Sequence, residues 1–363
     1  MKVVISCDDV LARDHVTEII ESILGLYDEA EIYTLAHKPK GILGPVELRK
    51  IHSTFLSHKV KSKKGLGELS YLIPSAAKNL FIPCSVDLII NISSGLSQGI
   101  KKCEKTKQIT YLYDNRYERK KKTFKEKFFS GFVKSFFKKS FKNADILWVS
   151  NSSLKQELAQ IGYESEVVEP PFKINDWQII PSPLFTYDHF AVNAKGLDLD
   201  MAKKIRSLFK EKGIKFKFFG IDGHLNEMKE GPEDKDFFGD RCSGELAPLL
   251  SGARAIIDLE DCSFPVASLK GLGTGRPVVS LDTPSNKAFL TGLGITHCAY
   301  DFDALKECIE EVLKSSIQVE SKKLRAHALN YNEIKFKAFF KRRIDKLFQI
   351  EEKRSDIEKD SCC

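Results

Sequence analysis

The sequence lacks a long hydrophobic run. Its 363 residues contain no stretch of about 18 consecutive apolar residues, the length that a membrane-spanning helix needs. The first residues, MKVVISCDD, form a β-strand pattern that reaches acidic residues by position 8, which is unlike a signal peptide. These absences predict a cytoplasmic protein, and they leave open a peripheral attachment to the inner face of the membrane.

Several short motifs are also absent. The nine cysteines include no C-x-x-C pair, which argues against a structural zinc site and a disulfide framework and suits a reducing cytosol. The final Cys362 and Cys363 weakly resemble a lipidation signal, but we expect a solvated tail. No G-x-G-x-x-G follows the first strand, which disfavours a nicotinamide-dependent oxidoreductase. We identify no D-x-D motif placed to bind Mg²⁺ or Mn²⁺, so no metal is expected.

The composition that is present is ordinary for a globular protein with a sizeable core. Hydrophobic residues make up 42% of the chain and charged residues 29%. The length fits two domains of roughly 150–200 residues each. The net charge of +7 favours anionic partners, namely nucleotides, acidic lipid headgroups or nucleic acid.

Apolar runs alternate with amphipathic segments through the first half of the chain. The strand-like run VVIS is followed by HVTEIIESILGLY, whose apolar spacing predicts a helix over 15–27. Further strands are predicted at 31–36, 86–94, 108–113 and 144–150. This repetition predicts a mostly parallel sheet that is covered on both faces and binds ligands at the carboxyl ends of its strands.

A proline-rich segment, residues 166–186, has no helical period and is interpreted as a linker. The alternation then resumes, with strands predicted at 189–194, 214–220, 253–259 and 276–281, and helices at 198–212, 266–273 and 303–315. The charged remainder, 319–363, is predicted to be a helix and tail that packs back across the first domain. The fold prediction is therefore α/β: two Rossmann-like, doubly wound domains, 1–165 and 187–318, facing across a cleft.

One stretch, residues 119–142, is strongly basic and contains seven phenylalanines. On a helical wheel Phe132, Phe136 and Phe137 lie on one broad face, and lysines that include Lys127 gather opposite. Such a helix can lie in a membrane interface with its lysines on anionic headgroups. The alternative is a domain helix with its phenylalanines in the core and its basic face in solvent. No recognition motif supports nucleic-acid binding, which we do not expect.

Segments in both halves carry a family resemblance: VDLIINISSG (86–95), FKFFGIDGHL (216–225) and LGTGRPVV (272–279). In this order they resemble the family 4 glycosyltransferases, and the likeness extends over about residues 1–315. The resemblance implies the GT-B architecture of two Rossmann-like domains. It also implies a nucleotide sugar as the donor substrate, a glycan or lipid-linked acceptor, and no cofactor.

The donor motif of that family is degenerate in this sequence. The family has two glutamates on either side of seven residues, ahead of a Gly-Thr-Pro; counting back from Pro277 places these positions at Cys262 and Lys270. A lysine cannot accept hydrogen bonds from ribose hydroxyls, but it could contact a phosphate or an acidic sugar. Glu260 lies two residues before Cys262 and would restore one acid if the loop were shifted in register.

The resemblance also assigns the groups that would hold the diphosphate. Ser263 and Phe264 keep the backbone N–H groups that would point at it from the start of a helix, whereas Pro265 has none. Lys195 corresponds to the lysine of the family's basic pair, and Gly220 to a glycine of the second domain. The alternatives are a plain strand-to-helix turn over 260–275 and an ordinary surface lysine at 195.

Two residues of the first domain are candidates for a catalytic base. Asp114 falls near the position where the family has a histidine, and His15 follows the first strand. A carboxylate or an imidazole could take a proton from an acceptor hydroxyl. A lone acidic residue or histidine at a strand end can equally serve as a cap.

These observations predict a glycosyltransferase that moves a sugar from a nucleotide-sugar donor to a polysaccharide or lipid-linked acceptor. The family resemblance implies retention of anomeric configuration and no metal. The alternative, favoured by the loss of both glutamates, is a catalytically silent subunit that partners an active enzyme. A third interpretation is another GT-B activity, such as sugar-nucleotide epimerisation.

Overall fold

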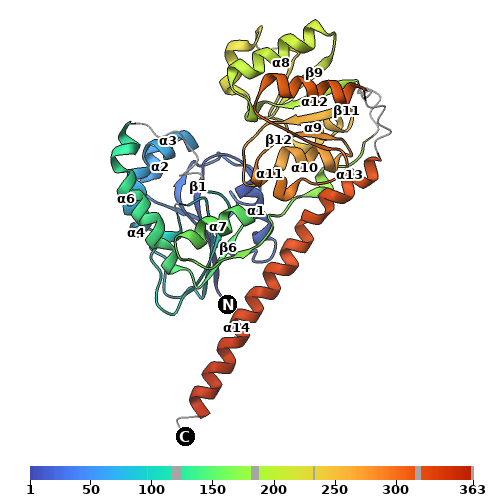
Figure 1. Ribbon diagram of the computed structural model, residues 1–363. Helices are drawn as coiled ribbons and strands as arrows, with labels where there is room; N and C mark the ends of the chain where they lie inside the picture. Colours follow the sequence, from blue (N-terminus) through green and yellow to red (C-terminus); the bar gives the residue numbers. More distant parts are fainter. Residues whose placement is uncertain (96, 116–123, 181–187, 232–233, 315–319, 361–363) are drawn as a thin grey trace. The chain divides into compact units, whose positions relative to one another are not determined.

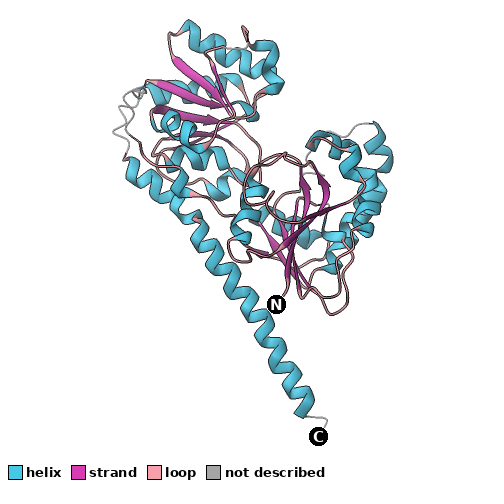
Figure 2. Ribbon diagram, turned by 180° about the vertical axis from the view of Figure 1, so that it is seen from behind, coloured by secondary structure: helices cyan, strands magenta, loops and turns pink. Residues whose placement is uncertain are grey.

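The computed structural model describes the chain except for residues 96, 116–123, 181–187, 232–233, 315–319 and 361–363. The chain divides into two compact units (Figure 1). Unit 1 contains Met1–Pro171 together with Glu333–Cys363, and unit 2 contains Phe172–Asn332. In each unit, helices lie on both sides of a twisted sheet (Figure 2).

Unit 1 is built on a seven-stranded parallel sheet with the order β3-β2-β1-β4-β5-β6-β7. Its strands are β1 (Val3–Val10), β2 (Glu31–His37), β3 (Ile51–Ser53), β4 (Leu88–Ser93), β5 (Lys107–Leu112), β6 (Ile146–Val149) and β7 (Glu166–Val167). The central strands are buried along nearly their whole length, as expected of a sheet covered on both faces. The sequence predicted all of these strands except the short edge strands β3 and β7.

The helices of unit 1 are α1 (His15–Leu24), α2 (Leu56–Lys59), α3 (Lys63–Glu68), α4 (Ile73–Asn79), α6 (Phe124–Ser140), α7 (Ser152–Gln160) and α14 (Glu333–Asp360). α1 begins at the first residue of the helix that the sequence predicted, and Asp14 caps it. The Asp14 carboxylate accepts a hydrogen bond from the Thr17 backbone N–H, and the Thr17 hydroxyl reaches back to Asp14 N. This reciprocal capping box satisfies two N–H groups that the first turn would otherwise leave without partners.

The C-terminal helix α14 belongs to unit 1, as the sequence predicted. Phe336, Phe340 and Ile344 recur every four residues and are buried, so they form one stripe along the helix. The Phe340 ring packs edge-on against Trp148 of β6 with 4.7 Å between ring centroids. This stripe joins the first half of α14 to the first sheet.

Unit 2 is built on a six-stranded parallel sheet with the order β10-β9-β8-β11-β12-β13. Its strands are β8 (His189–Asn193), β9 (Lys215–Phe219), β10 (Phe237–Gly239), β11 (Ala253–Asp258), β12 (Val278–Leu281) and β13 (Ile295–Cys298). Its helices are α8 (Leu199–Glu211), α9 (Ser243–Ser251), α10 (Val266–Gly273), α11 (Pro284–Phe289), α12 (Phe302–Lys314) and α13 (Ser321–Ala328). α10 has the bounds that the sequence predicted.

The boundaries of the units differ from the predicted domains within the linker and within the tail. The end of the predicted linker packs into unit 2, because Phe172, Ile174 and Trp177 are buried there. α13, predicted as part of the tail, also belongs to unit 2, where it packs against α10. Gly273 of α10 lets the linker residues pack closely, since a Cβ there would lie 3.1 Å from both Ile174 and Trp177.

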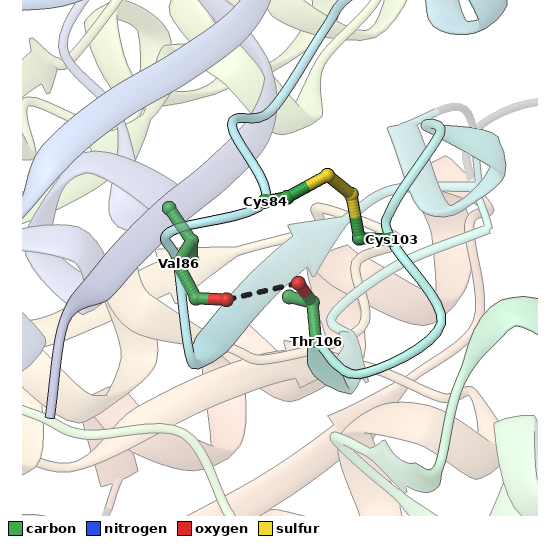
Figure 3. The surroundings of a disulfide bond; sticks show 4 residues. All are labelled: Cys84, Val86, Cys103 and Thr106. Atoms are coloured by element: carbon green, nitrogen blue, oxygen red, sulfur yellow. Dashed lines mark hydrogen bonds between the residues drawn. A yellow bond between two sulfur atoms is a disulfide. The ribbon is translucent and has the colours of Figure 1, made fainter.

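One sequence expectation is wrong: the chain does contain a disulfide, Cys84–Cys103 (Figure 3). Cys84 lies shortly before β4, and Cys103 lies shortly before β5. Because β4 and β5 are parallel neighbours, the segments that lead into them meet at one edge of the sheet. The Thr106 hydroxyl donates to the Val86 carbonyl 2.9 Å away and holds the same two segments together.

Candidate functional site

The candidate donor site lies at the carboxyl edge of the sheet of unit 2, in the loops after β8 and β11. The Lys195 ammonium lies 2.5 Å from a Glu260 carboxylate oxygen. The lysine side chain is 56% exposed and the glutamate 20%, so this ion pair is open to solvent on the lysine side. The two residues that the sequence analysis proposed separately therefore form one charged pair.

Asn193, the last residue of β8, connects this pair to its surroundings. Its amide nitrogen donates to Asp258 at 2.8 Å and to the second Glu260 oxygen at 3.3 Å. Its amide oxygen accepts from Lys195 N at 3.2 Å and lies 3.2 Å from the Cβ position of Gly220. Three predicted donor residues, Lys195, Gly220 and Glu260, thus surround one buried asparagine.

Gly196 is required by the close approach of the two loops. A Cβ on this glycine would lie 2.4 Å from the Glu260 backbone nitrogen and 2.6 Å from the Leu259 carbonyl carbon. Such distances are too short for any side chain, so only glycine fits between the loops. The close approach fixes Lys195 next to Glu260.

The start of α10 holds an acidic side chain of this same chain. Asp258, the last residue of β11, is buried, and one of its carboxylate oxygens accepts from the Ser268 N–H at 3.0 Å and the Ser268 hydroxyl at 2.7 Å. Ser268 lies in the first turn of α10, where free N–H groups attract anions. Burial, followed by repulsion from Glu260, raises the pKa of Asp258 above its ordinary value of 3.8.

The other predicted donor residues of the loop before α10 face inward or are half-covered. Ser263 and Phe264 are each only 1% exposed, and the Phe264 ring packs edge-on against Phe289 at 5.0 Å. The Cys262 thiol is half-buried and donates to the Phe264 carbonyl at 3.2 Å. A diphosphate would reach the Ser263 and Phe264 amides only after this loop moved, so their role remains a prediction.

Lys270 lies in the middle of α10 and is half-buried. Its ammonium lies over the Trp177 ring, 4.7 Å from the ring centroid, a distance typical of a cation–π contact. Trp177 belongs to the segment that the sequence interpreted as linker. The structure therefore gives Lys270 an aromatic neighbour that the sequence analysis did not foresee, and a role with the donor remains a prediction.

The two candidate bases both lie in unit 1, at the carboxyl edge of its sheet. His15, the first residue of α1, is buried, and its Nε2 lies 2.7 Å from the Pro171 carbonyl oxygen. A carbonyl only accepts, so Nε2 carries the proton and Nδ1 accepts from the Tyr113 hydroxyl at 2.9 Å. His15 can act as a base only if its hydrogen bond to Tyr113 opens.

Asp114 follows Tyr113 directly and is half-buried. Its carboxylate accepts from the Asn115 backbone N–H at 2.8 Å. The residues that follow, 116–123, lie outside the described part of the chain. Asp114 thus follows β5 and His15 follows β1, at the same carboxyl edge of the sheet, and the role of Asp114 as a base remains a prediction.

Among the phenylalanines of the Phe/Lys helix, α6, whose side chains the structure describes, some lie in the core and one lies in solvent. Phe137 is buried and packs edge-on against Phe141 at 4.9 Å, so it is not available to a membrane surface; this part of the prediction is wrong. Phe136 is half-buried against the core of unit 1, and Phe132 is 59% exposed. The Lys127 side chain lies outside the described residues.

Two polar residues of the site were missed by sequence analysis. Asn193 and Asp258 end strands that are neighbours in the sheet, and a polar residue at the carboxyl end of a buried strand is a signal that was available. In unit 1, Asp8 lies near the carboxyl end of β1. Its carboxylate accepts from Ser94 N at 2.6 Å and from Ser97 N at 2.8 Å. Burial raises the pKa of Asp8.

No group of three or more His, Cys, Asp or Glu side chains that could hold a metal ion occurs within the described residues. None of the helices in this part of the chain is both long enough and apolar enough to cross a bilayer.

Comparison with solved structures identifies the architecture of the chain. Sucrose-phosphate synthase from Thermosynechococcus elongatus superposes with a TM-score of 0.72 over 96% of this chain and 100% of its own, at 11% sequence identity. Anabaena HepE in complex with UDP-glucose gives 0.66 over 95% and 100%, at 12% identity. A glycosyltransferase from Rickettsia africae gives 0.58 over 94% and 97%, at 12% identity.

The chain has the GT-B fold. Its two parallel-sheet units correspond to the two Rossmann-like domains of these glycosyltransferases, as the sequence predicted. At such low identity the likeness shows the fold alone. No protein-family model matches the sequence, and no curated protein matches it either.

Proposed function

We propose that this protein is a glycosyltransferase that binds a nucleotide sugar at the carboxyl edge of the sheet of unit 2. The observation that carries the proposal is the Lys195–Glu260 pair, which the loops after β8 and β11 hold beside Gly220. This is the edge of a parallel sheet where ligands bind in doubly wound domains. Structurally similar HepE was solved with UDP and with UDP-glucose, which supports a nucleotide sugar as the ligand.

In the proposed reaction, the bond between the anomeric carbon and the phosphate oxygen breaks, and the acceptor hydroxyl oxygen bonds to that carbon. The nucleoside diphosphate leaves, and the hydroxyl loses its proton to a base. The Lys195 ammonium would stabilise the negative charge that develops on the leaving phosphate. The Glu260 carboxylate accepts hydrogen bonds and would take up donor hydroxyls in place of the acid missing at Cys262.

We propose further, from the family resemblance, that transfer retains anomeric configuration, needs no metal and uses a polysaccharide or lipid-linked acceptor. Proton NMR of the first product formed would give its anomeric configuration directly. Activity in the presence and absence of a chelator would test the metal requirement. An inverted product would contradict the assignment of a retaining mechanism.

Binding of nucleotides and nucleotide sugars to the Lys195→Ala variant tests the donor site. Loss of a charged hydrogen bond to phosphate costs about 1.5–3 kcal/mol, so we expect a Kd raised about tenfold or more. Lys204 is a matched control, because it is also half-exposed and paired with an acid, Asp200, but lies on α8. Unchanged affinity in Lys195→Ala, or equal losses in both variants, would contradict the site.

A second candidate function is a silent GT-B subunit that partners an active enzyme. It is favoured by one observation: the carboxylate of Asp258 already sits at the start of α10, where a phosphate would otherwise bind. A protein that binds nucleotide sugars but neither transfers nor hydrolyses them would support this candidate. Release of nucleoside diphosphate that depends on Lys195 would exclude it.

α6 supports a peripheral contact with anionic membranes at Phe132 and the exposed lysines Lys134 and Lys138. Replacement of Phe132 by serine should weaken binding to anionic vesicles. Phe81, exposed elsewhere in unit 1, provides the control substitution. Equal binding by the wild type and Phe132→Ser would leave α6 without a membrane role.

A further inference from the structure

A loop of unit 1 presents two leucines to solvent. Leu43 and Leu48 are 82% and 84% exposed, the highest values among the large hydrophobic side chains that the structure describes. They lie in the segment between β2 and β3, residues 38–50, which we name the Leu43/Leu48 loop. Single exposed apolar residues are common on protein surfaces, but two on one short loop call for a physical explanation.

The loop is fixed in a conformation that holds these leucines outward. Ile42 and Val46 alternate with them and are buried, so the loop is anchored in the core of unit 1. The Glu47 carboxylate accepts from the Lys40 backbone N–H at 2.8 Å. The Arg13 guanidinium donates to the Leu43 carbonyl at 3.0 Å and pairs with Glu21. These contacts hold the backbone of the loop on either side of Leu43.

The charge around the leucines is positive. Lys38, Lys40 and Lys50 are exposed on the loop, whose one acid, Glu47, is turned toward His37 and the Lys40 backbone. Lys50 lies 3.6 Å from Glu31, an acid of β2.

The basic surface continues from the loop onto α2. The Ser57 hydroxyl of α2 accepts from the His37 backbone N–H at the base of the loop. Lys59 and Lys61, on and just after this helix, are exposed. Lys59 lies over the half-exposed Phe55 ring at 5.8 Å.

We propose that the Leu43/Leu48 loop is a bilayer-contact site that inserts its two leucines into the interface of an anionic membrane. Leucine side chains enter the acyl boundary, and surrounding lysines remain at the level of acidic headgroups. The positive charge of the loop complements the negative charge of an anionic membrane, and we therefore take a membrane as the partner. The loop follows β2 at the same sheet edge as His15, so a bound membrane would bring lipid-borne hydroxyls to that edge. The proposal does not depend on nucleotide-sugar binding.

The test is co-sedimentation of the full-length protein with vesicles of phosphatidylcholine alone and of phosphatidylcholine with phosphatidylserine. We expect wild-type protein to bind the anionic vesicles, and Leu43→Ser/Leu48→Ser to bind them at least tenfold more weakly. Leu293→Ser, a substitution at a 67% exposed leucine of unit 2, is the matched control and should bind like wild type. Lys38→Gln/Lys40→Gln should bind more weakly and show a smaller salt dependence.

Three results would overturn the proposal. They are wild-type protein that binds no vesicles, unchanged binding by the double leucine variant, and loss of binding only in Phe132→Ser, which would assign the membrane to α6. Light scattering tests whether the loop binds a second copy of this chain instead. A wild-type dimer that Leu43→Ser/Leu48→Ser dissociates would identify the loop as an interface between copies of this chain. An unchanged melting temperature and an unchanged Kd for nucleotide separate each outcome from misfolding and from failure of the donor site.

Discussion

Removing the Cys84–Cys103 disulfide should destabilise unit 1 by an amount set by the length of the loop that the disulfide closes. The two cysteines are 19 residues apart, and closing a loop of about 20 residues lowers the entropy of the unfolded chain by the equivalent of about 3 kcal/mol. For a unit of this size, 1 kcal/mol corresponds to about 2–4 °C in Tm. Cys84→Ser/Cys103→Ser should therefore lower the melting temperature of unit 1 by roughly 6–12 °C.

The two tryptophans allow this change to be assigned to one unit. Trp148 is buried in unit 1 and Trp177 in unit 2, and the sequence has no other tryptophan. A Trp177→Phe background leaves Trp148 as the reporter, and a Trp148→Phe background reports on unit 2. We expect the double serine variant to shift the Trp148 transition strongly and the Trp177 transition little.

The reasoning also predicts the effect of a reducing agent. A reductant should lower the Trp148 transition of the wild type to the level of the double serine variant, and should not affect the variant itself. A wild type whose unfolding is the same with and without reductant would refute the disulfide and restore the expectation from sequence that the cysteines are free.

Three further predictions concern single substitutions. Gly196→Ala should lower stability by about 1–3 kcal/mol and weaken nucleotide binding, because its methyl group would force apart the loops of Lys195 and Glu260; urea unfolding and calorimetry measure the two effects. The pKa of Asp258 is raised in the folded state, so at pH values between 3.8 and the folded pKa the folded protein keeps a proton that the unfolded chain loses. The free energy of unfolding should therefore fall as the pH rises through this range, and Asp258→Asn should flatten this slope when unfolding is measured against pH. On α6, Phe137→Ala should cost about 3–5 kcal/mol and Phe132→Ala less than about 0.5 kcal/mol in urea unfolding, and equal costs would contradict the burial described for the two rings.

The strand–helix alternation was readable because central parallel strands are apolar on both faces. VVIS, VDLIINISS and ARAIIDL each coincide with a buried strand, and α10 ends at the predicted residue, before the positive-φ Gly275. The region from Phe55 to Leu80 was not assigned because its helices, α2, α3 and α4, are only four to seven residues long. Segments this short contain too few turns to show a helical period.

The candidate site was predictable only in part, for reasons of distance along the chain. Lys195 and Glu260 were found separately by resemblance, but their pairing depends on β8 and β11 being neighbours, which is a property of the sheet order. The disulfide was missed for the same reason, because Cys84 and Cys103 meet through the register of two strands. The inward orientation of Phe264 depends on packing with Phe289, which follows no local pattern.

Hydrogen exchange with and without saturating UDP-glucose tests the central claim most directly, because it locates the bound ligand along the chain. The account predicts slower exchange in two stretches of unit 2, residues 193–198 and 258–268, and loss of this protection in Lys195→Ala but not in Lys204→Ala. Protection confined to unit 1, or protection of the same two stretches that persists in Lys195→Ala, would contradict a donor site built on Lys195 and Glu260.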